Sequence, residues 1–317
     1  MSSAPIDSIS VVIPALDAGS VIDRCLDAIL AQTDCPPFDV WVAVGPSADD
    51  TQTRVDARST ADARVRRVEN PSGRTPSALN AAIAASDGML VVRVDAQSQI
   101  PAGYLAAVAA ASTATGAANV GGRQVPVGDD AWSIAIAAAM ASSFGAGPAV
   151  FRGGGTAGPT DTVYLGAFRR DALEAVGGYD DDLIRNQDYE LNWRLRDAGH
   201  VVWFDPDIAV EYRPRGSLRA LGSQYWQYGR WKRKVLLANP RSVRLRQLVA
   251  PGLVLGLVAS VLVAVAIAPP LGLVVPGVYA VAVAGAALRS IGAPRIRVAA
   301  AFVTMHLAWG TGFLVGR

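Results

Sequence analysis

The last third of this 317-residue chain lacks acidic residues entirely. All 27 Asp and Glu lie at or before Glu211, whereas 14 Lys and Arg follow it. Residues 1–211 therefore hold 27 acidic and 15 basic residues, a formal charge of −12, although the whole chain is at +2. Binding to nucleic acid needs clustered Lys and Arg, so we expect no nucleic-acid partner for the acidic part.

Cysteine and histidine are also scarce, with two of each. Cys25 and Cys35 provide neither a disulfide framework nor metal-ligand spacing, and are predicted to pack in a reducing compartment. His306 lies in an apolar run, where an ionisable side chain usually faces protein, so we predict a packing role. The opening residues MSSAPIDSISVVIP show no signal-peptide pattern, and the acidic part is expected to stay in the cytosol.

Long hydrophobic runs occur only near the end of the chain. Residues 248–268 carry no charge and are long enough to cross ~30 Å of hydrocarbon at ~1.5 Å per residue. A Pro-Pro pair at 269–270 ends this run, and two further apolar runs cover 271–288 and 298–315. Buried core helices are the alternative, but three successive runs without one acidic residue favour membrane spans.

The positions of Lys and Arg predict an orientation. Ten basic residues lie between Arg213 and Arg246, none lies in the turn at 269–270, and three lie between the second and third runs. Because basic loops stay on the cytoplasmic side, we predict a multi-pass cell-membrane protein with its catalytic domain in the cytoplasm. The predicted domains are a cytosolic domain at 1–212, amphipathic interface helices at 213–247 and a transmembrane region at 248–317.

The acidic part is predicted to form an α/β domain. Short β-branched runs alternate with helical segments, which predicts βαβ units with right-handed crossovers and a mostly parallel sheet. The predicted strands are 9–13, 38–44, 65–68 and 89–94, and the predicted helices are 20–31, 51–58 and 75–85. Ligands bind such sheets outside the carboxyl ends of the strands, which here means Pro14, Gly45–Asp50 and Asp95.

Two carboxylates are candidates for chemistry. Asp95 follows the strand MLVVRV, where it could hold Mg²⁺ or Mn²⁺ against a diphosphate, although such residues often only form turns. Asp188 lies with Glu190 in the first turn of a predicted helix, where a carboxylate could accept a proton from a sugar hydroxyl. The alternative for Asp188 is that it merely complements the helix dipole.

A third candidate is the aromatic and basic segment QYWQYGRWKRK at 224–234, just before the first apolar run. Within it, Gln227-x-x-Arg230-Trp231 offers an aromatic face for a sugar and a guanidinium for a phosphate. The alternative is an amphipathic helix lying at the membrane interface. The two interpretations are compatible.

Several segments together resemble the inverting glycosyltransferases of family 2, especially the succinoglycan-biosynthesis type with a carboxyl-terminal membrane region. The similarity runs in the expected order over nearly all of residues 9–238. It is carried by SVVIPALDAGSVIDRCLDAILAQ, GRTPSALNAAIAASDGMLVVRVDAQSQIP, GAANVGG, DTVYLGAFRRDALEAVGGYDDDLIRNQDYELNWRLRDAG and QYWQYGRW.

The resemblance implies a GT-A fold, which is a Rossmann-like nucleotide-diphospho-sugar transferase domain. Asp188 would be the catalytic base, and Asp95 with Gln97 would bind a divalent metal, Mg or Mn. The implied donor- and acceptor-binding residues are Pro14, Asp49, Asp50, Arg74, Gln187, Gln227, Arg230 and Trp231.

This sequence departs from the family pattern at two places. The second strand of the family usually ends in acids that bind uracil, whereas Val44 and Gly45 stand here, and Asp49 or Asp50 would replace them for a UDP-linked donor. The usual Asp-x-Asp metal motif is Asp95-Ala-Gln97 here, which leaves a single carboxylate.

We therefore predict a metal-dependent, inverting glycosyltransferase. It would move a sugar from a nucleotide sugar to a lipid-linked saccharide in the membrane, during exopolysaccharide or cell-wall glycan synthesis. Two alternatives remain open: an enzyme that uses polyprenyl phosphate itself as acceptor, and an inactive membrane scaffold that has lost the acids at Val44 and Gly45. A processive synthase is disfavoured, because three spans offer little of the channel that it requires.

Overall fold

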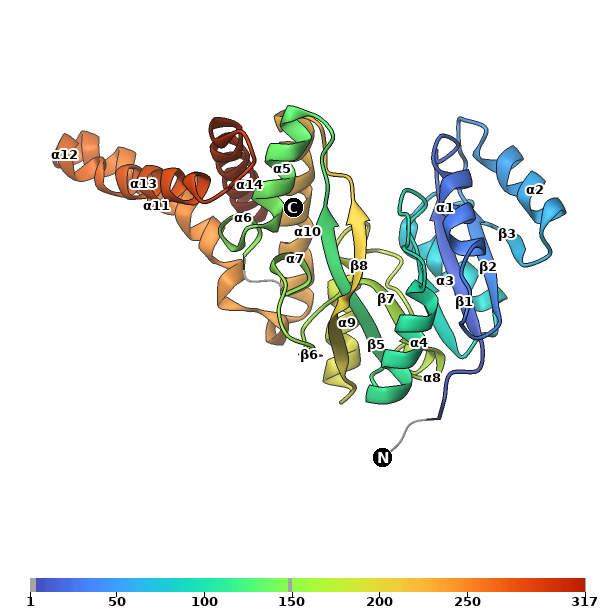
Figure 1. The fold of residues 1–317 in the computed structure, drawn as a ribbon. Coiled ribbons are helices and arrows are strands. Elements are labelled where there is room, and N and C mark those ends of the chain that lie inside the picture. Colours follow the sequence, from blue (N-terminus) through green and yellow to red (C-terminus); the bar gives the residue numbers. More distant parts are fainter. Residues whose placement is uncertain (1–3, 148–149, 317) are drawn as a thin grey trace. The chain divides into compact units, whose positions relative to one another are not determined.

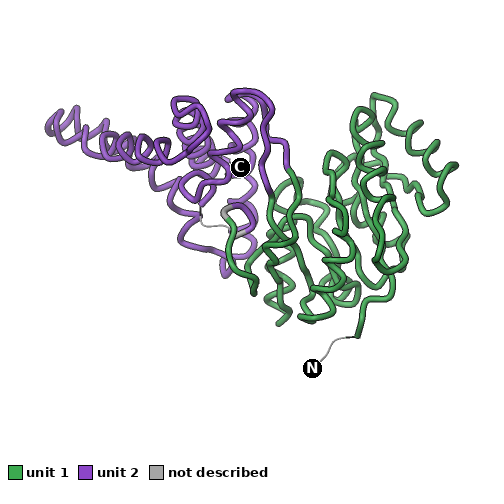
Figure 2. The backbone as a smooth tube through the Cα atoms, viewed as in Figure 1, with its two compact units in different colours: residues 1–124, 154–211 green, residues 125–153, 212–317 purple. Residues whose placement is uncertain are grey.

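The computed structural model describes residues 4–147 and 150–316. The chain divides into two compact units (Figure 2). The first comprises residues 1–124 and 154–211, and the second comprises residues 125–153 and 212–317. The first unit is an α/β domain and the second is helical (Figure 1).

The α/β unit is built on one sheet whose strand order is β3-β2-β1-β4-β7-β5-β8-β6. The last residues of β5 and β8 continue into the second unit. The strands are β1 (Ile9–Ala15), β2 (Phe38–Val44), β3 (Val65–Glu69), β4 (Leu90–Arg93), β5 (Asn119–Pro126), β6 (Gly158–Pro159), β7 (Tyr164–Arg169) and β8 (Val202–Tyr212). All four strands predicted from the sequence are present.

Strand direction divides the sheet into two parts. β1 is parallel to β2 and β4, and β2 is parallel to β3, as predicted for βαβ units. β7 is antiparallel to both β4 and β5, and β6 is antiparallel to β8. The prediction of a mostly parallel sheet is therefore right for β1–β4 and wrong for the sheet as a whole. The sequence pattern identifies strands but not the insertion of β7 between β4 and β5.

The helices of this unit bury the sheet. Alternate residues Ile9, Val11 and Ile13 of β1 share one hydrophobic cluster with the apolar sides of α1 and α4. A different set of buried residues on α3 packs against β1 and β2. The helices are α1 (Ile22–Leu30), α2 (Thr51–Ala61), α3 (Thr75–Ala85), α4 (Tyr104–Thr115), α8 (Arg170–Ala175) and α9 (Gln187–Asp197). The three helices predicted between the first four strands are confirmed.

The second unit is a set of helices packed around α14. α10 lies along α14, and their backbones approach closely at Gly229. Only glycine fits there, since a Cβ at this position would lie 2.0 Å from the Trp309 carbonyl oxygen. The helices are α5 (Ala131–Ala141), α6 (Ser143–Ala146), α7 (Val150–Gly153), α10 (Leu218–Ala238), α11 (Val249–Ala266), α12 (Pro269–Gly272), α13 (Val274–Leu288) and α14 (Arg295–Val315). Short 3₁₀ turns at 240–242 and 245–247 join α10 to α11.

All three predicted apolar runs form helices that are long and apolar enough to cross a membrane, at 249–266, 269–288 and 295–315. The first two are exposed along most of their length: Val265 is 84% exposed and Val281 75%. Apolar exposure on this scale is typical of a lipid-facing surface. α14 is more buried, because one of its faces packs on α5 and α10.

His306 has the packing role that was predicted for it. Its two ring nitrogens lie 3.0 Å from the hydroxyl of Tyr279 on α13 and 2.8 Å from the backbone oxygen of Phe144 on α6. The ring also stacks on Phe302. His306 thus ties three helices of this unit together.

Candidate active site

Asp95 and Asp188 meet at one guanidinium, that of Arg93. Arg93 is the last residue of β4, and its Nε and Nη2 lie 2.9 and 2.8 Å from Oδ1 of Asp95. Its Nη1 donates to Oδ1 of Asp188. The Arg93 side chain is only 8% exposed. The structure therefore brings together the two carboxylates that the sequence motifs singled out separately.

Arg93 itself was missed at the sequence level. The prediction of a strand at 89–94 rests on its apolar residues, and Arg93 lies within that strand. A signal was available, because Arg is almost never buried in a sheet unless it is paired. A charged residue two positions before Asp95 on a central strand already points to a partner at the same edge.

The first turn of α9 separates the roles of its two acids. Oε1 and Oε2 of Glu190 accept hydrogen bonds of 2.7 and 2.8 Å from Arg194, which also donates to the backbone oxygens of Val176 and Gly178. Glu190 thus holds the preceding loop against the helix. Asp188 points instead to Arg93, so it is the acid that faces the sheet edge.

The electrostatic surroundings of Asp188 favour a carboxylate that can take up a proton. Desolvation by the surrounding protein raises the pKa of the Asp188 carboxyl, although its side chain is 42% exposed. The charge of Arg93 opposes this rise in the pKa, and the charge of Asp95 adds to it. A carboxylate with a raised pKa is a stronger base than an ordinary aspartate.

Buried amides anchor α9 to the sheet. Nδ2 of Asn119 on β5 donates to Oδ1 of Asn192 over 2.6 Å, and Nδ2 of Asn192 donates to Thr162 over 3.0 Å. Leu191 and Leu195 of the same helix are fully buried. Because buried amide pairs are costly to break, they fix the rotation of α9 and so the direction of Asp188.

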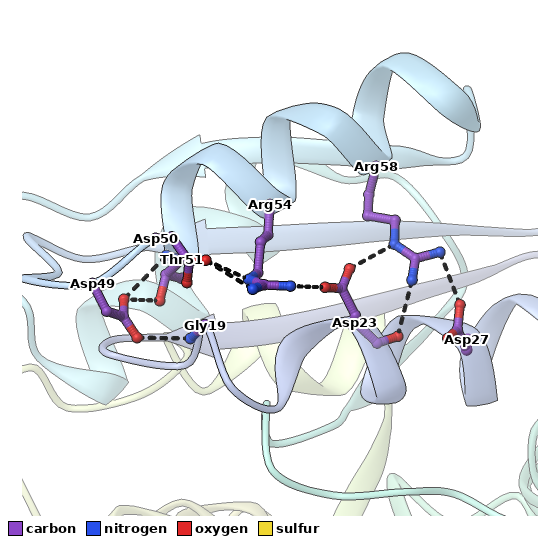
Figure 3. A network of polar contacts seen from close by, with 8 residues as sticks. All are labelled: Gly19, Asp23, Asp27, Asp49, Asp50, Thr51, Arg54 and Arg58. Atoms are coloured by element: carbon purple, nitrogen blue, oxygen red, sulfur yellow. Dashed lines mark hydrogen bonds and ion pairs between the residues drawn. The ribbon is translucent and has the colours of Figure 1, made fainter.

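The loops after β1 and β2 are joined by side chains (Figure 3). Oδ2 of Asp49 accepts a 2.8 Å bond from the Gly19 backbone, and its Oδ1 accepts a 3.0 Å bond from the Thr51 backbone. The Thr51 hydroxyl accepts a 2.7 Å bond from the Ala18 backbone. The hydrogen bond from the Thr51 side chain is the main cause that lowers the pKa of Asp49. Asp49 therefore organises this loop pair.

Asp50 belongs to a ladder of ion pairs between α1 and α2 (Figure 3). Arg54 lies 2.8 Å from Asp50 and 2.7 Å from Asp23, and Arg58 lies 2.7 Å from Asp23 and 2.8 Å from Asp27. The ladder fixes the two helices that follow the loops. Asp49 and Asp50 thus both have protein partners at the sheet edge where a donor base was predicted to bind.

The packing around the end of β2 explains why Val44 and Gly45 stand there in place of the expected acids. Val44 is 3% exposed and belongs to the main hydrophobic cluster, so an acid there would be buried. A Cβ at Gly45 would lie 3.0 Å from Cδ1 of Leu16 and 3.3 Å from the Cα of Gly73. Gly73 has a φ of +65°, which glycine adopts without strain. Close backbone packing takes the place of the usual acids.

The remaining predicted residues of this unit lie in or next to the turns at the same sheet edge. Pro14 is half-buried on β1 opposite Ala43, and Gln97 is exposed in the turn after Asp95. Arg74 precedes α3, with its Nη1 3.8 Å from Oδ1 of Asp182 in the loop before α9. Gln187 is buried as the first residue of α9.

Gln227, Arg230 and Trp231 lie on α10 of the second unit. The guanidinium of Arg230 stands 5.7 Å from the ring centre of Trp226, and Nζ of Lys234 stands 4.9 Å from that of Trp231. Stacked cations and indoles suit both a membrane interface and a sugar phosphate. Neither of the two interpretations of this segment is therefore excluded by the structure.

The predicted metal-binding residues, Asp95 and Gln97, offer one carboxylate and one amide oxygen. No group of three or more His, Cys, Asp or Glu converges on a metal position within residues 4–147 and 150–316, so an all-protein cage is absent there. Mg²⁺ and Mn²⁺ are commonly held by one or two carboxylates together with the phosphates of a substrate. Asp95 supplies one such carboxylate, and Gln97 in the turn that follows it is exposed.

Comparison with known proteins gives consistent results. The sequence model of glycosyl transferase family 2 matches residues 10–177. The chain is 31% identical over 327 aligned positions to the succinoglycan biosynthesis protein ExoA of Rhizobium meliloti (strain 1021), covering 99% of this chain and 96% of that protein.

Solved structures of similar fold include the mannosyltransferase PcManGT from Pyrobaculum calidifontis in complex with GDP-Man and Mn²⁺. It has a TM-score of 0.69 and 20% identity, and the match covers 96% of this chain and 88% of that one. S. aureus TarS 1–349 in complex with UDP-GlcNAc gives a TM-score of 0.53 at 14% identity, covering 97% and 90%. At these identities the likeness concerns the fold, which is the GT-A type of α/β fold predicted from the sequence.

Proposed function

The chain belongs to glycosyl transferase family 2, and we propose that it is a metal-dependent, inverting enzyme acting on a lipid-linked saccharide. The sugar would come from a nucleotide sugar and extend an exopolysaccharide or cell-wall glycan precursor. One observation carries this proposal: Arg93 draws Asp95 at the end of β4 and Asp188 at the start of α9 to a single point. These two contacts support the assignment of Asp188 as the base next to Asp95 as the carboxylate on the diphosphate side.

In this reaction Asp188 accepts the proton of the acceptor hydroxyl. The acceptor oxygen then forms a bond to the anomeric carbon on the face opposite the diphosphate, whose bond to that carbon breaks, and the configuration inverts. The raised pKa of the Asp188 carboxyl suits it to take that proton. A divalent cation bound at Asp95 would supply charge stabilisation for the departing diphosphate.

Arg93 positions both carboxylates in this scheme. Its guanidinium offsets the repulsion between two negative side chains that share one site. It also keeps them at fixed geometry before substrate arrives, because Arg93 is itself held on a central strand. We assign it no contact with the reacting atoms.

Donor binding is proposed at the carboxyl edge of β1, β2 and β4. Arg74, Pro14 and Gln187 would approach the donor there, while Asp49 and Asp50 shape the loops that would hold its base. A UDP-linked donor remains the expectation. The similar folds were solved with GDP-Man in one case and UDP-GlcNAc in the other, so the donor nucleotide varies on this fold.

The acceptor is proposed from the second unit and the curated relative. Three helices suited to a membrane and the basic segment at 213–246 support anchoring, with residues 1–212 in the cytoplasm, 213–247 at the interface and 248–317 in the bilayer. Anchoring raises the effective concentration of a lipid-linked acceptor. ExoA is named for succinoglycan biosynthesis, which supports an exopolysaccharide precursor as the substrate class.

Product analysis tests this proposal. Membranes containing the chain are given single nucleotide sugars with a lipid extract, and the lipid product is hydrolysed in mild acid and sized. We expect release of a saccharide longer than the acceptor glycan, with inverted anomeric configuration. A product that is only a monosaccharide phosphate would exclude the lipid-linked saccharide and favour polyprenyl phosphate as acceptor.

A further inference from the structure

The second unit contains an arginine that has no acidic partner among the described residues. Arg152 on α7 donates from Nη1 to the hydroxyl of Tyr225 over 3.1 Å, and its guanidinium lies 5.4 Å from the ring centre of Phe151. Its Nε is buried and has no hydrogen-bond partner among the residues that the structure describes. This positive charge is therefore only partly satisfied.

The composition of the unit explains the missing acid. Within 125–153 and 212–317 the only acidic side chains are Asp129 and Asp130. Asp129 pairs with Arg213 at 2.7 Å, and Asp130 caps α5 through the backbone of Trp132 and the next residue. No acid of this unit thus remains to neutralise Arg152.

The hydroxyls of Tyr225 and Tyr228 on α10, and of Tyr212 at the end of β8, lie near the guanidinium of Arg152. Nε2 of Gln224 donates to the hydroxyls of Tyr228 and Tyr212 over 2.9 and 3.1 Å, and the rings of Tyr225 and Tyr228 meet edge to face at 5.6 Å. Burial raises the pKa of Tyr225 and of Tyr228, so both keep their protons at neutral pH. The Tyr225 hydroxyl accepts from Arg152 and has its own hydrogen to donate.

Gln224 carries a second unsatisfied atom. Its Oε1 is buried and lacks a partner among the described residues. Because its neighbours are hydroxyls, which donate as well as accept, the amide can also lie reversed with NH₂ at that place. In that orientation Gln224 holds a buried NH₂ donor one residue before Tyr225 on α10.

Such a cluster destabilises the folded protein when no ligand binds to it. A buried charge without a counter-ion destabilises the fold, and a buried donor without a partner adds to that cost. Guanidinium and hydroxyl donors that converge without any acid form the usual recognition set for phosphate oxygens.

We propose that Arg152, Tyr225 and Gln224 form a binding site for the phosphate or diphosphate group of a membrane lipid. α10 ends at Ala238 and the first apolar helix of the same unit begins at Val249, so the site belongs to the part of the chain that carries the membrane helices. Its assignment to a lipid-linked acceptor rests on the proposed function. A soluble phosphate ester would use the same chemistry.

Equilibrium binding tests the site without any sugar transfer. The full chain is placed in phosphatidylcholine nanodiscs with EDTA, and binding of radiolabelled farnesyl diphosphate is measured against competing farnesol and inorganic pyrophosphate. We expect competition by unlabelled farnesyl diphosphate but not by farnesol. Arg152→Met should weaken binding about tenfold to a hundredfold, and Tyr225→Phe by a smaller factor. Arg219→Met, an exposed arginine on the same helix, should leave it unchanged.

Three outcomes are decisive. Unchanged farnesyl diphosphate affinity in Arg152→Met would overturn the site. If inorganic pyrophosphate competes as well as farnesyl diphosphate, the cluster binds anions, and the proposal that its ligand is a membrane lipid is wrong. Strong binding without detectable sugar transfer would support the site while the proposed function fails.

Thermal unfolding without ligand separates this role from a structural one. Replacing a buried charge that lacks a counter-ion with Met should leave the midpoint of the ligand-free chain unchanged or raise it. Farnesyl diphosphate should raise the midpoint of the wild type but not that of the variant. A lower midpoint in Arg152→Met, with ligand stabilisation retained, would show that Arg152 only supports the fold.

Discussion

At the scale of single residues, the site depends on one cation between two carboxylates. Asp95 and Asp188 were predicted from motifs, because a carboxylate at a strand end or a helix start has recognisable neighbours in the sequence. Arg93 was not predicted, since its importance arises only when α9, nearly a hundred residues later, is packed against β4. A buried arginine on a strand indicates that it has a partner, but a local pattern does not identify a partner so distant in the sequence.

The role of Arg93 can be tested by substitution. Arg93→Met should lower kcat/KM by about a hundredfold, because the two carboxylates then repel each other and lose their shared geometry. The same variant should also bind Mn²⁺ with changed affinity in equilibrium dialysis, a readout that does not need turnover. Arg24→Met, at an exposed position on α1, is the matched control. Wild-type activity and Mn²⁺ affinity in Arg93→Met would contradict the positioning role.

At the scale of elements, the structure explains where sequence patterns succeed. The first four strands and the three helices between them follow from apolar periodicity and from turn residues, and all are present. The direction of β7 is not encoded in that way, because a strand has the same alternation whether it runs parallel or antiparallel. The hydrogen bonds that link the loops after β1 and β2, including those of Asp49, were not predicted from the sequence either.

That link predicts different effects for two adjacent aspartates. Asp49→Ala removes the acceptor for Gly19 and Thr51, so the loop pair should open and the donor KM should rise about tenfold, with a smaller change in kcat. Asp50→Ala removes one exposed ion pair with Arg54 and should change KM less than about threefold. Steady-state kinetics with varied donor measure both variants. Equal effects of the two substitutions would refute the assigned difference.

The ladder between α1 and α2 should give a pH-dependent stability. Hydrogen bonding to Arg58, the main cause, lowers the pKa of Asp23 in the folded chain, and burial partly opposes it. A carboxyl with a lowered folded pKa stabilises the fold above its unfolded pKa of about 3.9, and loses this effect as pH falls through the folded value.

Asp23→Asn should accordingly lower the free energy of unfolding by about 1 kcal/mol at pH 7, in line with partly exposed ion pairs. The difference from wild type should shrink as the pH is lowered below 4. Thermal unfolding of the detergent-solubilised full chain across this range provides the measurement, with Asp34→Asn at an exposed loop position as control. A difference that is independent of pH would rule out the ionic contribution.

At the scale of the whole molecule, the uneven distribution of charge predicts the membrane topology. The three apolar helices were predicted from composition, and the basic residues that flank them predict an orientation for the chain. What composition did not reveal is that α14 also packs on α5 and α10, since residues 125–153 are separated from it by more than a hundred positions.

Cysteine labelling of intact cells tests this topology. Ile267→Cys, between the first and second spans and 73% exposed, should react with a membrane-impermeant maleimide. Ile291→Cys, 93% exposed between the second and third spans, should react only after the cells are opened. The native Cys35, in the proposed cytoplasmic domain, serves as an internal control. The reverse pattern would place the catalytic domain outside.

The central claim is that Asp95 and Asp188 together perform glycosyl transfer. It is tested most directly by the release of nucleoside diphosphate from a panel of nucleotide sugars, in membranes with lipid extract and Mg²⁺ or Mn²⁺. The comparison includes wild type, Asp95→Asn, Asp188→Asn and the control Asp87→Asn, which changes an aspartate outside the site. We predict that one donor gives metal-dependent turnover, which both site substitutions abolish and the control retains. Undiminished turnover in Asp95→Asn or Asp188→Asn, or the absence of turnover with every donor, would contradict the account.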